Sequence, residues 1–167
     1  SVKEYESKKS IIDIAKDISD GLARNVVAGE VNGVMHDLRD EIESDCELNL
    51  ITVKDKEALS VIRHSASHVL AEAVKRVFPD AKLAIGPSIA EGFYYDFDHE
   101  PFSREDLDKL EAEMKKIIKE GAHIEKFELP REEAIKFMEE KNEPYKVELI
   151  KDLPEGEKIS FYKQGDF

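Results

Sequence analysis

Two histidines lie four residues apart in the stretch RHSASHVLAEAV, residues 63–74. On a helix with about 100° per residue, His64 and His68 lie roughly 40° apart, so their rings can converge on one small target. The apolar residues of the same helix fill a broad arc, and the histidines lie roughly opposite its centre, beside Glu72 and Lys75. This placement weakens the interpretation of two core histidines and leaves two exposed surface histidines as the plain alternative.

Three kinds of chemistry use a pair of histidines at this spacing. A zinc metalloprotease needs a glutamate directly after the first histidine, and Ser65 stands there instead, so that class is excluded. A metal site with two histidines stays open, although no third ligand is visible. Two neutral imidazoles could instead bind a polar ligand and place a water molecule near pH 7.

Composition limits the classes of partner. The formal charge of −13 argues against strong general binding of nucleic acids, because Lys and Arg supply the affinity for phosphate. Cys46 is the only cysteine, which excludes an internal disulfide and a multi-cysteine zinc site and fits a reducing, cytoplasmic setting. No apolar run approaches the roughly 18 residues of a membrane span, so no membrane partner is expected. The first residue is Ser1 rather than Met, and we interpret the 167 residues as a fragment of a longer protein.

Residues 1–53 are predicted to form one small α+β unit. The stretch KKSIIDIAKDIS predicts an amphipathic helix with Ser10 as its N-cap, and the Asp-Gly pair at 20–21 predicts a break. Residues 23–38 predict two strands joined by a turn that contains glycine, and residues 47–53 predict a further strand. The order indicates a small β-grasp-like fold, followed by a short polar connector at 54–60.

Residues 61–167 are predicted to form a second α+β unit, with an antiparallel sheet and flanking helices. Its first helix is expected to begin in the connector, at about Glu57, and to end before Pro79. Two further helices are predicted. One begins at the Ser103 capping pattern and ends at Gly121, and the other begins after Pro130. The predicted strands are residues 82–85, 92–98, 123–129, 145–150 and 158–163.

A longer string around the histidines carries a resemblance to a known family. Residues 63–98 strongly resemble the segment that opens the N-terminal editing domain of bacterial-type threonyl-tRNA synthetases. The family pattern is H-x-x-x-H on a helix, then I-G-P, then G-F-Y-Y-D, and this sequence has all three, at 64–68, 85–87 and 92–96. EPYKV at 143–147 also matches. Residues 1–53 resemble the family's ubiquitin-like TGS module without its first strand, with VNG at 31–33 and LITVKD at 50–55.

The resemblance implies roles for four residues. His64 and His68 match the paired catalytic histidines of the editing site, Lys146 matches a lysine of that pocket, and Tyr95 matches a tyrosine that binds the substrate there. On the sequence alone, Tyr95 would be a core aromatic of a strand and Lys146 a solvated strand lysine. His36, His99 and His123 show no partner pattern and are expected at the surface or in turns.

The resemblance also implies a function. The parent would attach threonine to tRNA(Thr) with ATP, and this region would hydrolyse mischarged Ser-tRNA(Thr) at the tRNA 3′ end. The residues themselves are expected to hold no cofactor or metal. ATP, Mg²⁺ and Zn²⁺ are implied for a catalytic domain outside this sequence, and a homodimer through other domains, in the cytoplasm, is implied for the parent.

One family motif is missing. The family completes its editing site with a D-x-C-x-x-x-H segment, which the sequence lacks, and Cys46 lies in the wrong unit to replace it. We therefore expect an editing domain truncated before that segment and inactive on its own. Two alternatives remain: a non-enzymatic binding module made of a TGS unit and a helix, and a free-standing editing factor related to the alanyl-tRNA synthetase editing domains.

Overall fold

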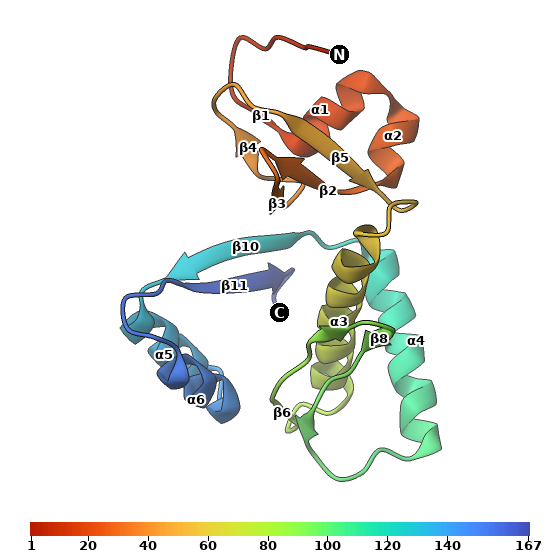
Figure 1. The fold of residues 1–167 in the computed structure, drawn as a ribbon. Helices are drawn as coiled ribbons and strands as arrows, with labels where there is room; N and C mark the ends of the chain where they lie inside the picture. The colour runs from red at the N-terminus through yellow and green to blue at the C-terminus, as the bar shows by residue number, and fades with distance from the viewer. The chain divides into compact units, whose positions relative to one another are not determined.

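The computed structural model describes residues 1–167, which divide into two compact units, 1–64 and 65–167 (Figure 1). No helix has the length and apolar character needed to span a bilayer. The elements of residues 1–57 are β1 (Lys9–Ser10), α1 (Ile11–Ile18), α2 (Asp20–Asn25), β2 (Val26–Val31), β3 (Val34–His36), β4 (Glu41–Ile42) and β5 (Leu48–Thr52).

The elements from residue 58 onward are four helices and six short strands. They are α3 (Ala58–Val77), β6 (Lys82–Leu83), β7 (Ser88–Ile89), β8 (Gly92–Phe93), β9 (Phe97–Asp98), α4 (Arg104–Glu120), β10 (Ile124–Leu129), α5 (Arg131–Glu140), α6 (Pro144–Asp152) and β11 (Ile159–Gln164).

The first unit is a three-stranded antiparallel sheet, β3-β2-β5, with α1 and α2 beside it (Figure 1). A β-carbon on Gly29 in β2 would lie 2.7 Å from the Ile11 side chain, so only glycine lets the start of α1 approach the sheet this closely. The β2–β3 hairpin turns at Asn32 and Gly33, both with positive φ, as a tight hairpin turn requires. The predicted hairpin is confirmed.

Ser10 caps α1 by accepting a hydrogen bond from the Asp13 amide, which confirms the predicted helix start. The predicted break at residues 20–21 is wrong. The chain bends one residue earlier, at the extended Ser19, whose hydroxyl accepts from the Leu22 amide and opens α2 at Asp20. The Asp-Gly pair therefore starts a short helix.

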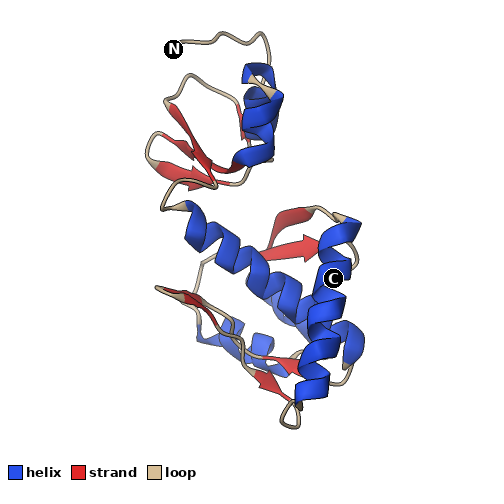
Figure 2. Cartoon of the chain, turned by 90° about the vertical axis from the view of Figure 1, so that its right-hand side faces the viewer, coloured by secondary structure: helices blue, strands red, loops and turns tan.

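The second unit has two apolar clusters. Its strands form only two-stranded antiparallel pairs, β6–β9, β7–β8 and β10–β11, among the helices (Figure 2). One cluster joins α3 to α4 through Val69, Val74, Leu110 and Ile117. The other packs α5 and α6 against the antiparallel β10–β11 pair. The capping box of Ser103 and the left-handed Gly121 bound α4 as predicted, and the α+β class with antiparallel pairing is confirmed.

Two predicted strands of this unit are wrong. Residues 92–98 form two short strands, because β8 pairs with β7 whereas β9 pairs with β6, and the chain changes partner between them. Residues 145–150 lie in helix α6. Pro144 occupies the first helical position, and Val147 and Ile150, one turn apart, enter the α5–α6 cluster, so helical periodicity prevails over the alternation that suggested a strand.

Candidate functional site

Helix α3 carries His64 and His68 one helical turn apart, as predicted. The His64 side chain reaches solvent, but partial burial lowers the pKa of its imidazole because the charged form loses hydration. The His68 ring is half-buried and packs edge-on against Tyr162 of β11, with 5.4 Å between ring centroids. The helix therefore holds one imidazole that favours its neutral form and one whose ring is fixed by an aromatic neighbour.

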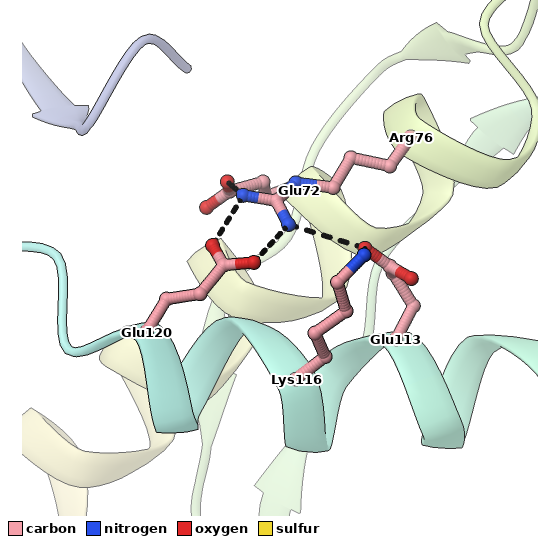
Figure 3. A network of polar contacts seen from close by, with 5 residues as sticks. All are labelled: Glu72, Arg76, Glu113, Lys116 and Glu120. Atoms are coloured by element: carbon pink, nitrogen blue, oxygen red, sulfur yellow. Dashed lines mark hydrogen bonds and ion pairs between the residues drawn. The ribbon is translucent and has the colours of Figure 1, made fainter.

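The histidine side of α3 is less exposed to solvent than the sequence suggested. Glu72, expected on the exposed side, is only 4% exposed, and Ser67 is 2% exposed. Glu72 can be buried because Arg76, one turn further on, binds its Oε1 at 2.7 Å and also binds Glu113 and Glu120 of α4 (Figure 3). The prediction that α3 has one apolar face and one exposed polar face is wrong at Glu72, because α4 covers that part of the polar face.

Lys146 and Tyr95 form a second group of contacts. The Lys146 ammonium donates a hydrogen bond to the Ala84 carbonyl at 2.7 Å and lies 3.3 Å from the Tyr95 hydroxyl oxygen. A lysine has three N–H donors, so one donor is left for a ligand. The interpretation of Lys146 as a solvated strand lysine is wrong, because its helix packs the side chain against β6.

Burial changes the acid–base properties of both side chains. Desolvation lowers the pKa of Lys146, and the nearby Glu143 carboxylate opposes part of that shift. Desolvation, assisted by Glu143, raises the pKa of Tyr95 to about 12. Tyr95 therefore stays a neutral hydroxyl, and Lys146 holds its proton less tightly than an exposed lysine does.

Gly86 allows Tyr95 to take this position. A β-carbon on Gly86 would lie 2.1 Å from Cδ2 of the Tyr95 ring, well inside contact distance. The ring also stacks on Phe97, with centroids 4.7 Å apart. Tyr95 is thus half-buried between a glycine backbone and an aromatic face, while its hydroxyl lies beside Lys146, so it is neither fully buried nor part of a strand.

Comparisons with known proteins match both parts of the chain. A family model described as "TGS domain" matches residues 1–52. Over 168 aligned residues, covering 100% of this chain, the sequence is 66% identical to threonine–tRNA ligase of Acetivibrio thermocellus. It is 60% identical, again over 100% of the chain, to threonine–tRNA ligase of Clostridioides difficile.

The chain is homologous to the N-terminal region of threonine–tRNA ligases. The corresponding enzyme of Caldanaerobacter subterraneus is 57% identical over 99% of the chain. In each of these three relatives the match covers 26% of the relative, so the chain spans about a quarter of the length of these curated proteins. The resemblance inferred from the histidine string is thereby confirmed.

Within residues 65–167, the structure brings Lys146 and Tyr95 together. Neither of the two hydrogen bonds of Lys146 goes to a histidine. Two surface hollows, of about 490 Å³ and about 260 Å³, lie within the TGS unit, and none of the four predicted site residues lines them. The roles of the four residues therefore stay predictions.

The structure also locates the other histidines. His36 lies in β3 and its Nδ1 is 3.0 Å from Asp40, whereas His123 is exposed. His99 lies in a bend after β9, partly exposed, and stacks on Phe102, which agrees with the expected surface or turn position. No group of three or more His, Cys, Asp or Glu side chains is arranged to hold a metal ion.

Sequence reasoning missed two charged pairs near the predicted site residues. Arg76 pairs with Glu72 on α3 itself and also binds α4, and Lys75 with Glu143 ties α3 to the start of α6. The first pair had a signal, since residues four apart on a helix are neighbours. The second had none, because its partners lie 68 positions apart in the sequence.

Proposed function

We propose that this chain is the N-terminal region of a threonine–tRNA ligase and contributes one part of a site that hydrolyses Ser-tRNA(Thr). The observation that carries the proposal is the match to threonine–tRNA ligases along the whole chain. The physical support is local. A pair of imidazoles stands one turn apart on α3, and a desolvated lysine keeps one donor available.

The need for such a site follows from the substrates. Serine lacks one methyl group of threonine, and a missing methyl group is worth only about 1–3 kcal/mol in a pocket, or roughly 10–200-fold in selectivity. A second site that hydrolyses the seryl ester raises the overall accuracy. Exclusion of the extra methyl group of threonine would protect the correct product.

The reaction is hydrolysis of an ester. A water oxygen attacks the seryl carbonyl carbon, the bond from that carbon to the ribose oxygen breaks, and the ribose leaves with a proton as a hydroxyl. One histidine of the pair would orient or deprotonate the water, and the other would hold the ribose hydroxyls or the seryl group. The free N–H of Lys146 would stabilise the negative charge that develops on the carbonyl oxygen. Tyr95 would contact the substrate beside it.

The partners and cofactors follow from the same proposal. The tRNA(Thr) 3′ end is the partner of this region. ATP, Mg²⁺ and Zn²⁺ would serve aminoacylation through residues outside this sequence, the parent would be a cytoplasmic homodimer, and the D-x-C-x-x-x-H segment of the family would complete the editing pocket. For that reason we expect residues 1–167 alone to show little or no deacylation.

The test is deacylation of preformed Ser-tRNA(Thr) by a full-length ligase that carries this sequence. We expect His64→Ala and His68→Ala each to lower the rate by about 10²–10⁴-fold, the usual worth of general acid–base catalysis, while threonylation is kept. His36→Ala is the control, since it removes a histidine of the TGS unit. Unchanged deacylation in both α3 variants would favour a binding module instead, and robust deacylation by residues 1–167 would indicate a free-standing editing factor.

A further inference from the structure

Glu143 is a buried carboxylate at the start of α6, with 5% of the residue exposed. Both of its oxygens have partners. Its Oε1 lies 2.7 Å from the Lys75 ammonium, and its Oε2 accepts a hydrogen bond from the Leu83 amide at 2.9 Å. A buried charge is tolerated when it is paired and hydrogen-bonded in this way.

Lys75 is fully occupied by this arrangement. Besides Glu143, its ammonium donates to the Pro79 carbonyl at 3.1 Å and the Ala81 carbonyl at 3.0 Å. These partners use all three N–H donors. Lys75 therefore has no donor left for a ligand, and it fixes the Glu143 carboxylate to the last turns of α3 and the loop after it.

Glu143 and Lys146 together hold α6 against β6. The two residues are three positions apart at the start of the helix, so their side chains are neighbours. They bind consecutive residues of one segment, Glu143 at the Leu83 amide and Lys146 at the Ala84 carbonyl. The position of the Lys146 ammonium therefore depends on the anchoring of Glu143.

A third contact supports the same turn of α6. The Tyr145 hydroxyl donates a hydrogen bond to Asp98 of β9 at 2.8 Å. This contact is exposed, so it is expected to add little stability compared with the buried pair. It shows that the first turn of α6 meets both strands of the β6–β9 pair.

The Glu143 carboxylate also acts through its charge. It favours the protonated form of Lys146 and so raises the pKa of that ammonium against the effect of burial. It disfavours ionisation of Tyr95 and so raises the pKa of that hydroxyl. A residue that only filled space would have neither effect.

We propose that Glu143, held in place by Lys75, is a positioning residue that fixes the Lys146 ammonium beside Tyr95 for the ester-hydrolysis site. The inference rests on the proposed function for its catalytic consequence. The contacts that fix Lys146 all lie within residues 65–167 and do not depend on the proposed function. Neither Glu143 nor Lys75 touches the reacting atoms, and both act through Lys146.

The first experiment measures the pKa of Lys146 in residues 1–167 by NMR titration of its ¹³Cε resonance, assigned with Lys146→Arg. Glu143→Gln removes the negative charge, so the pKa of Lys146 is expected to fall below its wild-type value. Glu148→Gln, an exposed carboxylate of the same helix, is the matched control and should leave it unchanged. An unchanged pKa in Glu143→Gln, or equal falls in both variants, would overturn the inference.

Lys75→Met should shift the pKa of Lys146 in the opposite direction, and it can be used if Glu143→Gln does not fold. It removes a positive neighbour and leaves the Glu143 carboxylate unpaired, so the pKa of Lys146 is expected to rise. A fall or no change would contradict the proposed arrangement.

The second experiment measures Ser-tRNA(Thr) deacylation by the full-length ligase. Glu143→Gln is expected to lower kcat by about 10-fold to 100-fold with KM nearly unchanged, as for a displaced catalytic group. If His68→Ala abolishes deacylation but Glu143→Gln does not change it, this inference fails and the proposed function stands. If His68→Ala and His64→Ala have no effect, the proposed function fails, while the pKa measurement still decides the role of Glu143.

Discussion

Two buried glutamates, each near a predicted site residue on its own helix, are satisfied to different degrees. Glu143, three residues before Lys146, has partners for both carboxylate oxygens. Glu72, four residues after His68, has Arg76 on Oε1, but its buried Oε2 has no hydrogen-bond partner. Burial accordingly raises the pKa of Glu72, in spite of the opposing effect of Arg76.

The difference separates two ways of positioning a side chain. Lys146 is held by tertiary contacts within residues 65–167, through a carboxylate that is fully paired. The histidines stand on a long helix whose own geometry sets their spacing, while Arg76, paired with Glu72, ties that helix to α4. The lysine region should therefore be sensitive to loss of a single partner, whereas the histidine region should respond more to pH.

Loss of the fully paired glutamate is expected to have the largest effect on stability. Glu143→Ala leaves Lys75 and the Leu83 amide without their partner, which should cost about 3–5 kcal/mol of unfolding free energy. Glu148→Ala, at an exposed position of the same helix, should change it by less than about 0.5 kcal/mol. Urea unfolding followed by circular dichroism measures both, and similar values for the two variants would contradict the comparison.

A smaller effect is expected from crowding Tyr95. Gly86→Ala places a methyl group against the ring, which should cost about 1–3 kcal/mol, as overpacking does. It should also lower the pKa of Tyr95 as the ring moves toward solvent, and absorbance titration measures this. Gly92→Ala is the control, because a β-carbon there meets no atom within 4 Å. Equal losses would show that Gly86 has no special contact.

Glu72, whose Oε2 has no hydrogen-bond partner, should make the free energy of unfolding depend on pH. Because the pKa of Glu72 is raised, the folded chain binds this proton more readily than the unfolded chain just above pH 4.5. The contribution of Glu72 to stability therefore falls as pH rises through that range. Glu72→Gln removes this fall, so the variant should gain stability relative to the wild type as pH rises above about 4.5. A difference that does not vary with pH, measured by urea unfolding, would show that Glu72 is not perturbed.

The smallest effect is expected at His64. Its pKa is lowered, so the unfolded chain binds this proton more readily, and the stability that depends on it is lost as pH falls below about 6.5. NMR titration of the imidazole, assigned with His64→Gln, should give a pKa below that of a model peptide. A value at or above it would mean that the histidine helix leaves His64 fully hydrated.

Local patterns in the sequence predicted much of the fold. Ser10, Ser103 and Gly121 act within one turn of the chain, so their capping roles could be predicted from neighbours alone. The spacing of His64 and His68 on one helix could be predicted for the same reason. The helical segment of residues 145–150 was mistaken for a strand, although Pro144 at its first position was a usable signal.

The surroundings of Lys146 could not be predicted from local patterns. Its partners, Ala84 and Tyr95, lie 62 and 51 positions away, and the Lys75–Glu143 pair joins residues that no periodic pattern relates. Long-range contacts of this kind depend on how helices and strands pack. Family resemblance singled out Lys146 and Tyr95, and the contacts that position them required the structure.

The editing role of α3 is tested by comparing hydrolysis of Ser-tRNA(Thr) and Thr-tRNA(Thr) by the full-length ligase and by its His64→Ala/His68→Ala double variant. We expect the unaltered enzyme to cleave the seryl ester at least about 10-fold faster than the threonyl ester, the lower limit that one methyl group sets. The double variant should cleave neither ester above the uncatalysed rate. Equal rates for the two esters in the unaltered enzyme, or undiminished seryl hydrolysis in the double variant, would contradict that role.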